Sequence, residues 1–207
     1  MIGKFISFEG TEGSGKTSVI KEVKQYLEDK GYVVMITREP GGIRISEKIR
    51  QIILDVDHTE MDARTEALLF AASRRQHLIE KVRPALEEGK IILCDRFVDS
   101  SLVYQGIARD LGFDEVYQIN KFAIEDTLPD LTLFVDVRPE VGLKRVFETP
   151  NREINRLDLE KINFHKKIYE GYLFLLDRFP KRIKRINGEA QIEEVAREAI
   201  SAIEQIL

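Results

Sequence analysis

The chain has 207 residues and a formal net charge of −4 at pH 7, with 36 acidic and 32 basic side chains. This length suits a single domain with a full hydrophobic core, which we place at residues 1–207, and the lack of a basic block disfavours a duplex nucleic-acid partner. No run approaches the ~20 apolar residues of a membrane span and the amino terminus lacks a signal-peptide layout, so we expect a soluble, cytoplasmic protein that binds small ligands.

Short apolar runs alternate along the chain with longer segments of helical spacing. The runs predict five strands, at residues 4–9, 33–37, 91–94, 131–135 and 182–186. Apolar residues at helical spacing predict helices at 19–29, 45–54, 63–87, 114–125, 140–147, 159–177 and 192–203. Buried strands joined by crossover helices indicate an α/β fold with a five-stranded parallel sheet that is flanked by helices on both faces.

The first predicted strand leads into Gly10-Thr11-Glu12-Gly13-Ser14-Gly15-Lys16-Thr17, which matches the phosphate-loop pattern G-x-x-x-x-G-K-[ST]. Glycines let backbone N–H groups surround phosphate oxygens, and a helix that starts near Lys16 points its positive dipole at them. We expect Lys16 to face solvent and reach the β- and γ-phosphates of a bound nucleotide, and Thr17 to offer its hydroxyl to Mg²⁺. Ser18 follows Thr17 and is included in the predicted nucleotide-binding set. An ordinary flexible glycine turn is the alternative, and the preceding strand disfavours it.

In open parallel sheets, ligands bind beyond the carboxyl ends of the strands, so polar residues that follow strands are candidate site residues. Arg38 follows the second predicted strand and opens the segment Arg38-Glu39-Pro40-Gly41-Gly42, while Asp95 and Arg96 follow the third. Asp95 can hold Mg²⁺ or its waters, although capping of the next helix is an alternative role. Asp136 ends the fourth strand and competes for the metal, but a helix-starting role is equally natural there.

Other reactive side chains are sparse. Cys94 is the single cysteine and lies in an apolar run, so we expect a small core residue and a reducing compartment. His58, His77 and His165 lie far apart in sequence without zinc-ligand spacing, so we expect ordinary core or surface histidines and no structural zinc.

Four segments in this order and spacing closely resemble thymidylate kinases: the phosphate loop, 38–42, Phe70-Ala71-Ala72-Ser73-Arg74, and the segment from Asp95 to Gln105. The resemblance covers nearly the whole chain. It implies a fold like that of P-loop nucleoside monophosphate kinases, and transfer of the ATP γ-phosphoryl group to thymidine 5′-monophosphate with Mg²⁺. The second pKa of such an acceptor phosphate is about 6, so no general base is required and catalysis reduces to alignment and charge neutralisation.

The resemblance also implies roles for individual residues. Arg38 and Arg96 match positions that hold the acceptor phosphate, and Arg96 joins Lys16 as a catalytic cation. Phe70 and Arg74, four apart on one helix face, match residues that stack on thymine and hydrogen-bond its edge. They border an expected apolar stripe of Ala67, Leu68, Ala71, Leu78, Ile79, Val82 and Leu86.

Further matches concern the acceptor pocket. Ser101, Tyr104 and Gln105 match positions that line it, where the tyrosine lies against the sugar and disfavours a 2′-hydroxyl. Glu12 matches a carboxylate that lies near the 3′-hydroxyl of the acceptor in one branch of the family.

That branch takes its catalytic cations from a mobile lid, which we place at about residues 149–158, with Arg152 and Arg156 as the cations. A merely solvated charged loop is the alternative for both. Arg145 and the segment Ile186-Asn187-Gly188 are candidates for contact with adenine. The resemblance further implies a homodimer, to which Leu69 is a candidate contributor.

Two alternative functions stay open from the residues. A kinase for another nucleoside monophosphate or for a deoxynucleoside would share the phosphate loop and the acidic-arginine pair after a strand. A GTP-binding regulatory switch is disfavoured because its guanine-reading pattern Asn-Lys-x-Asp is absent: Asn120-Lys121-Phe122 is followed by Ala123.

Overall fold

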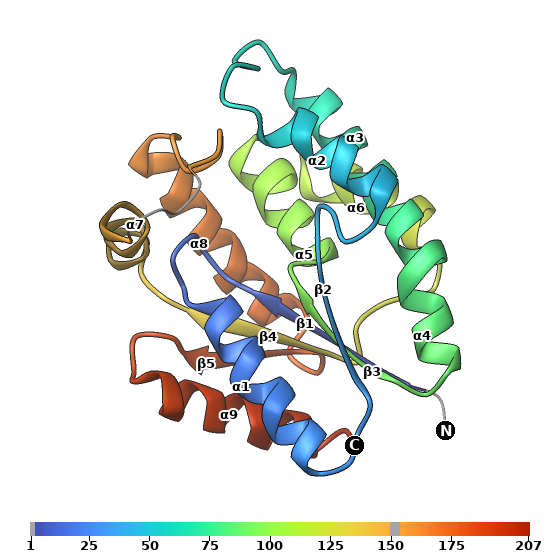
Figure 1. Ribbon diagram of the computed structural model, residues 1–207. Coiled ribbons are helices and arrows are strands. Elements are labelled where there is room, and N and C mark those ends of the chain that lie inside the picture. The colour runs from blue at the N-terminus through green and yellow to red at the C-terminus, as the bar shows by residue number, and fades with distance from the viewer. Residues whose placement is uncertain (1–2, 150–153) are drawn as a thin grey trace.

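Five parallel strands form one sheet, and a computed structural model describes residues 3–149 and 154–207 of the chain (Figure 1). The strands are β1 (Lys4–Glu9), β2 (Val34–Arg38), β3 (Ile91–Asp95), β4 (Leu131–Asp136) and β5 (Ile183–Asn187). They lie in the order β2-β3-β1-β4-β5, with every pair parallel. The predicted parallel α/β sheet is confirmed, and the predicted strand ends differ from the observed ones by at most one residue.

Helices cover both faces of this sheet (Figure 1). They are α1 (Lys16–Asp29), α2 (Arg44–Leu54), α3 (Ala63–His77), η1 (Leu78–Val82), α4 (Arg83–Glu87), α5 (Val98–Ser101), η2 (Leu102–Ala108), α6 (Phe113–Ile124), α7 (Pro139–Glu148), α8 (Ile162–Arg178) and α9 (Ile192–Glu204). Side chains of β1 alternate between two cores, because successive strand residues point to opposite faces. Ile6 and Phe8 pack with α1 and α9, whereas Phe5 packs with η1, α4 and α5.

The long helix predicted at 63–87 is instead three consecutive helical segments, α3, η1 and α4. The middle segment is a π-helix, in which the Arg83 N–H reaches back to Leu78 O. Pro84 follows at the start of α4 and has no N–H, so a regular α-helical bond is unavailable there. The wider turn rotates the helix faces, which is why one straight stripe does not run through all three segments.

The apolar stripe predicted for this region is wrong in two members. Leu68 and Ile79 are 56% and 43% exposed, while Glu66, Arg74 and His77 are buried on the inner face of α3. Polar residues occupy that face because they serve a hydrogen-bond network beneath the site. Residues 98–108, which carry Ser101, Tyr104 and Gln105, are helical as α5 and η2, a feature that the sequence did not predict.

Within the described residues, no helix combines the length and the apolar character that crossing a bilayer would require. Cys94 is buried in the sheet, as predicted.

Candidate active site

A cavity of about 730 Å³ opens at the carboxyl ends of β1, β2 and β3. Most of the residues predicted for ATP, acceptor and metal line it together: Glu12, Gly13, Ser14, Gly15, Lys16, Thr17, Ser18, Arg38, Phe70, Arg74, Asp95, Arg96, Ser101, Tyr104, Gln105 and Arg145. Gly10, Thr11 and Arg156 are not among its lining residues, and Arg152 lies outside the described part of the chain. The structure thus brings into one cavity predicted site residues that lie as far apart in the sequence as Glu12 and Arg145.

The phosphate loop has the backbone geometry that its glycines permit. Gly15 precedes α1 at φ +87°, in the left-handed region that side chains rarely adopt. Gly13 lies so close to α7 that a Cβ atom would stand 2.0 Å from Gly142 O. The loop therefore places the amino terminus of α1 at the cavity, where backbone N–H groups attract phosphate.

The Lys16 ammonium lies inside this loop, which corrects the expectation that it faces solvent. Nζ donates hydrogen bonds to Gly10 O (3.1 Å), Thr11 O (3.0 Å) and Ser14 Oγ (3.0 Å), and the residue is only 7% exposed. Burial, aided by the nearby positive charge of Arg96, lowers the pKa of Lys16 to about 8. A phosphate that contacts Nζ must replace at least one of the three acceptors in the loop.

The two side chains predicted to hold a metal lie in direct contact. Thr17 Oγ1 donates a 3.0 Å hydrogen bond to Asp95 Oδ2 at the rim of the cavity. A hydroxyl beside a carboxylate supplies the hard oxygen ligands that Mg²⁺ prefers, so the donor set fits that ion. The competing candidate, Asp136, is paired with Arg185 on β5 and does not line the cavity.

Arg74 is buried beneath the part of the cavity that Ser101 lines. Nε donates to Glu39 Oε2 (2.7 Å), Nη1 to Ser101 Oγ (3.0 Å) and to Asn120, and Nη2 to Phe97 O (3.0 Å). Four of the five guanidinium hydrogens are thus already engaged, which leaves one for a ligand. Glu39 belongs to the 38–42 segment, but its position between Arg74 and the ring of His77 could not be read from the sequence.

Glu12 projects from the phosphate loop toward Tyr104, Arg96 and His165. Its Oε1 accepts hydrogen bonds from Tyr104 Oη (2.6 Å) and Arg96 Nη2 (3.1 Å), and His165 Nδ1 lies 3.4 Å from its Oε2. Burial alone would raise the pKa of this carboxyl group, but His165, Arg96, Tyr104 and Lys16 together lower it to about 2. Glu12 is therefore a charged acceptor of hydrogen bonds at neutral pH.

Glu9, at the end of β1, holds the loop that carries Arg96, a role that the sequence analysis missed. Arg96 has φ +67°, and the next residue, Phe97, donates its N–H to Glu9 Oε1 at 2.7 Å. Ser100 and Tyr172 hydroxyls donate to the other carboxylate oxygen. Glu9 is a polar residue at the end of a strand, where ligand sites of parallel sheets lie, so its position in the sequence could have indicated a role at the site.

Stability should fall as Glu9 ionises. Burial, reinforced by the negative charge of Asp99, raises the pKa of Glu9 to about 7 from an ordinary 4.5. The native state then binds more protons than the unfolded chain between these values, so the free energy of unfolding decreases with rising pH in that window, by about 3 kcal/mol from this group. Urea unfolding near pH 5 and near pH 8 should show a smaller decrease in Glu9→Gln than in the wild type. Equal decreases in both proteins would contradict this assignment.

At the edge of the cavity, Arg145, predicted to contact adenine, contacts the loop after β5. Its Nη1 donates to Gly188 O at 3.1 Å. Arg156, predicted as a catalytic lid cation, does not line the cavity and is engaged by α2 and α3. Its guanidinium binds the buried carboxylate of Glu66, and its Nε donates to Ile53 O at 3.1 Å. Arg156 therefore joins the described residues 154–158 of the predicted lid to α2 and α3.

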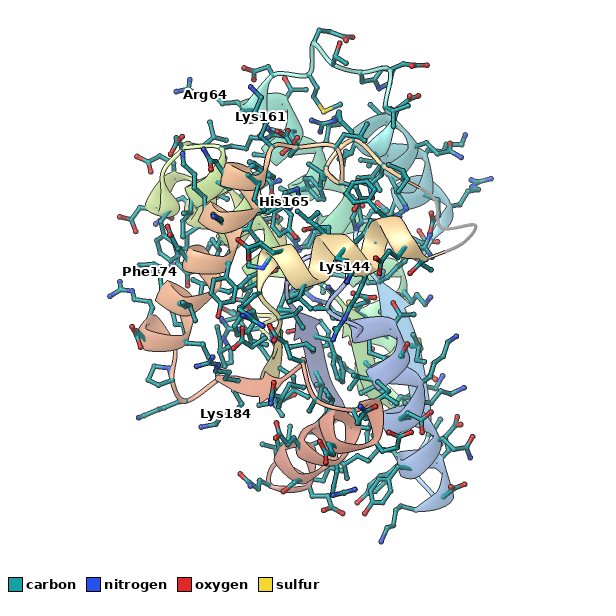
Figure 2. The ribbon with its side chains drawn as sticks, turned by 90° about the vertical axis from the view of Figure 1, so that its left-hand side faces the viewer. Arg64, Lys144, Lys161, His165, Phe174 and Lys184 are labelled. Carbon is teal, nitrogen blue, oxygen red and sulfur yellow. The ribbon has the colours of Figure 1, made fainter. Side chains whose placement is uncertain are left out.

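Helix α7 crosses the phosphate loop at backbone contact. A Cβ atom on Gly142 would stand 2.2 Å from Glu12 O, reciprocal to the close approach at Gly13. Gly142→Ala should therefore lower the melting temperature, with overpacking costing about 1–3 kcal/mol, even though alanine favours helix by about 1 kcal/mol. The matched control is Lys144→Ala on the same helix, labelled in Figure 2, whose side chain is 71% exposed. Equal melting temperatures for the two variants would refute the packing argument.

Comparisons with known proteins agree with this geometry. The thymidylate kinase family model matches residues 8–199. The thymidylate kinase of Oceanobacillus iheyensis is 59% identical over 207 residues, which cover all of this chain and 92% of that protein. The thymidylate kinase of Clostridium novyi is 57% identical over 196 residues, 95% of this chain and 96% of that one. A crystal structure of thymidylate kinase from Ehrlichia chaffeensis, 29% identical, superposes with a TM-score of 0.80 and covers 97% of this chain and 98% of its own. With its phosphate loop, its sheet order and this degree of identity, the chain belongs to the thymidylate kinase family.

Proposed function

We propose that the protein transfers the γ-phosphoryl group of ATP to thymidine 5′-monophosphate, the step that makes thymidine diphosphate for dTTP synthesis. One observation carries the proposal: a single cavity joins a phosphate loop to a second end that holds the arginines Arg38 and Arg96 and the aromatic ring of Phe70. Such a cavity can hold two nucleotides with their phosphates adjacent. We place the activity in the cytoplasm, where free nucleotides are present and thiols such as Cys94 stay reduced.

The chemistry needs positive charge more than a base. A nucleoside monophosphate is largely dianionic at neutral pH, because its second pKa is about 6, so its oxygen attacks without proton removal. In the proposal, Lys16 and the α1 amino terminus hold the β- and γ-phosphates of ATP, and Arg38 and Arg96 hold the acceptor phosphate. Thr17 and Asp95 would hold Mg²⁺, which when bound neutralises charge on the ATP phosphates.

Acceptor recognition is assigned to the other end of the cavity. Phe70 offers an aromatic face to thymine, and Ser101 and Gln105 offer hydrogen bonds. Tyr104 and Glu12, which contact one another, are assigned to the sugar, with Glu12 toward the 3′-hydroxyl. Arg74 acts from below, because its bond to Ser101 fixes that hydroxyl.

The lid arginines complete the proposal. Arg152 stays a candidate for neutralising charge in the transition state. Arg156 can take part only if it leaves Glu66, so in the geometry observed here its contribution is to hold the lid near the acceptor pocket.

A coupled assay of ADP formation tests the activity directly. Purified protein with ATP should turn over thymidine monophosphate and deoxyuridine monophosphate in preference to other nucleoside monophosphates and to thymidine. Chelation of divalent cations should stop the reaction and added Mg²⁺ should restore it. Preference for a different acceptor class would overturn the assignment, and GTP binding without transfer would favour a switch.

We further propose a homodimer formed through α3 and α6, which lie side by side (Figure 1). Two large apolar side chains are exposed there: Phe122 on α6 is 89% exposed and Leu68 on α3 is 56% exposed. Arg75 lies on the same face of α3 as Leu68 and donates to Ala123 O, next to Phe122, so the two exposed faces are neighbours. Leu69, the contributor suggested by the sequence, instead packs against a buried cluster of its own chain.

The Phe122→Asp substitution should convert the dimer to a monomer in sedimentation velocity, because it places a charge in the proposed apolar contact. Lys121→Asp, at the neighbouring position on the same helix, is the charge-change control. A wild-type protein that sediments as a monomer at micromolar concentration would exclude this interface.

A further inference from the structure

His165 is a buried histidine for which the proposed mechanism has no use. It is the fourth residue of α8, which descends in Figure 2 from Lys161 past His165 to Phe174. The residue is 1% exposed, and neither ring nitrogen has a hydrogen-bond partner among the described residues. A buried polar group without a hydrogen-bond partner lowers the stability of the fold, so the position of this ring calls for a physical explanation.

The His165 ring lies beside the carboxylate of Glu12. His165 Nδ1 lies 3.4 Å from Glu12 Oε2, and that oxygen is also buried without a hydrogen-bond partner in the described chain. The other oxygen, Oε1, is engaged by Tyr104 and Arg96. One oxygen of Glu12 is therefore fixed by hydrogen bonds within the protein. Among the described residues, the other has only His165 beside it and can accept a hydrogen bond from His165 or from a ligand in the cavity.

Apolar residues of α8 surround the position of the imidazole. The ring meets the Phe164 ring edge-on at a centroid distance of 5.9 Å, and Ile168, one turn further along α8, is fully buried. Helix α8 packs against η2, the segment that carries Tyr104. The same helix pair thus sets the positions of both side chains that flank the Glu12 carboxylate.

We propose that His165 is a positioning residue that determines specificity for the acceptor sugar: its ring N–H directs Glu12 Oε2 toward the 3′-hydroxyl. The inference rests on the proposed function, in which Glu12 faces that hydroxyl. A carboxylate oxygen held by one N–H donor keeps a lone pair for a second donor, and the substrate hydroxyl supplies it. An acceptor without this hydroxyl leaves the buried oxygen short of a partner, which is the physical basis of discrimination.

Loss of the ring N–H should weaken this discrimination and leave the phosphate contacts in place. Without His165, Glu12 keeps Arg96 and Tyr104 on Oε1, but Oε2 is free to rotate toward other donors or to accept a proton. Binding of the sugar then depends less on the 3′-hydroxyl. Phosphoryl transfer from bound substrates still uses Lys16 and Arg96, so KM for the acceptor should rise more than kcat falls.

The test compares kcat/KM for thymidine monophosphate with that for 3′-deoxythymidine monophosphate. The wild-type ratio should drop about tenfold or more in His165→Leu, the value expected for one hydrogen bond to a charged group. His165→Asn, whose amide nitrogen occupies the place of Nδ1, should retain most of the ratio. His165→Gln, whose amide reaches the place of Nε2, should behave like the leucine variant, and it replaces that variant if leucine prevents folding.

Glu12→Gln separates failure of the inference from failure of the proposed function. A wild-type enzyme that does not discriminate between the two acceptors overturns both, because Glu12 then does not face the hydroxyl. A ratio that falls in Glu12→Gln but stays unchanged in folded His165→Leu overturns the role of His165 alone. A fall in both, with rescue by His165→Asn, supports the inference, since a merely structural defect would lower activity toward both acceptors equally.

Discussion

Replacing Lys16 with methionine is expected to lower kcat by a factor on the order of 10²–10³, the loss measured when one preorganised hydrogen-bond donor to the transition state is removed from an active site. The ammonium also holds three loop acceptors, Gly10 O, Thr11 O and Ser14 Oγ, so the loop itself is less well fixed in the variant. We therefore expect a rise in the dissociation constant of ATP, measured by titration calorimetry, together with the fall in kcat.

Lys16→Arg is the matched control for charge. Its guanidinium keeps the positive charge but cannot enter a cradle fitted to an ammonium group, so recovery should be partial. Thermal unfolding by circular dichroism checks that both variants are folded. A Lys16→Met enzyme with kcat within threefold of the wild type would remove this residue from the mechanism.

Replacing Arg74 with methionine is expected to cost about 3–5 kcal/mol of unfolding free energy, because it leaves the Glu39 carboxylate buried without its charge partner. Arg74 is 1% exposed and Glu39 is 5% exposed, so solvent cannot replace the lost interaction. The hydroxyl of Ser101 also loses its donor, and KM for the acceptor should rise. Urea unfolding gives the first quantity and steady-state kinetics give the second.

The double variant Arg74→Met/Glu39→Gln distinguishes a lost pair from a lost side chain. Because it removes both charges, it should recover part of the stability lost in Arg74→Met, and the coupling is read from the double-mutant cycle. Strict additivity of the two single substitutions would show that the observed ion pair does not govern stability here.

The sequence predicted the features that depend on local pattern. Strand ends were accurate because buried parallel strands read as short apolar runs with clear boundaries. The phosphate loop and the Thr17 and Asp95 pair were accessible for a related reason: the loop has fixed spacing, and strand ends converge at one edge of the sheet.

Features that depend on tertiary packing were not accessible. Leu68 on α3 and Ile79 on η1 are exposed although they fit the predicted apolar stripe. The buried face of α3 also carries polar residues, such as Glu66 and Arg74, whose partners lie on other elements. The hydrogen bonds from Lys16 to its own loop and from Arg156 to Glu66 likewise depend on acceptors that no sequence pattern specifies. The roles of Glu9 and His165 could be assigned only from their neighbours in space, which the sequence does not give.

The backbone crossing between Gly13 and Gly142 limits how this scaffold can vary. Neither position can accept even a methyl group without displacing main-chain atoms of the other segment. We therefore expect any side chain at either glycine to destabilise the contact between the phosphate loop and α7. Redesign of nucleotide preference should begin instead at side chains that line the cavity, such as Phe70 and Gln105.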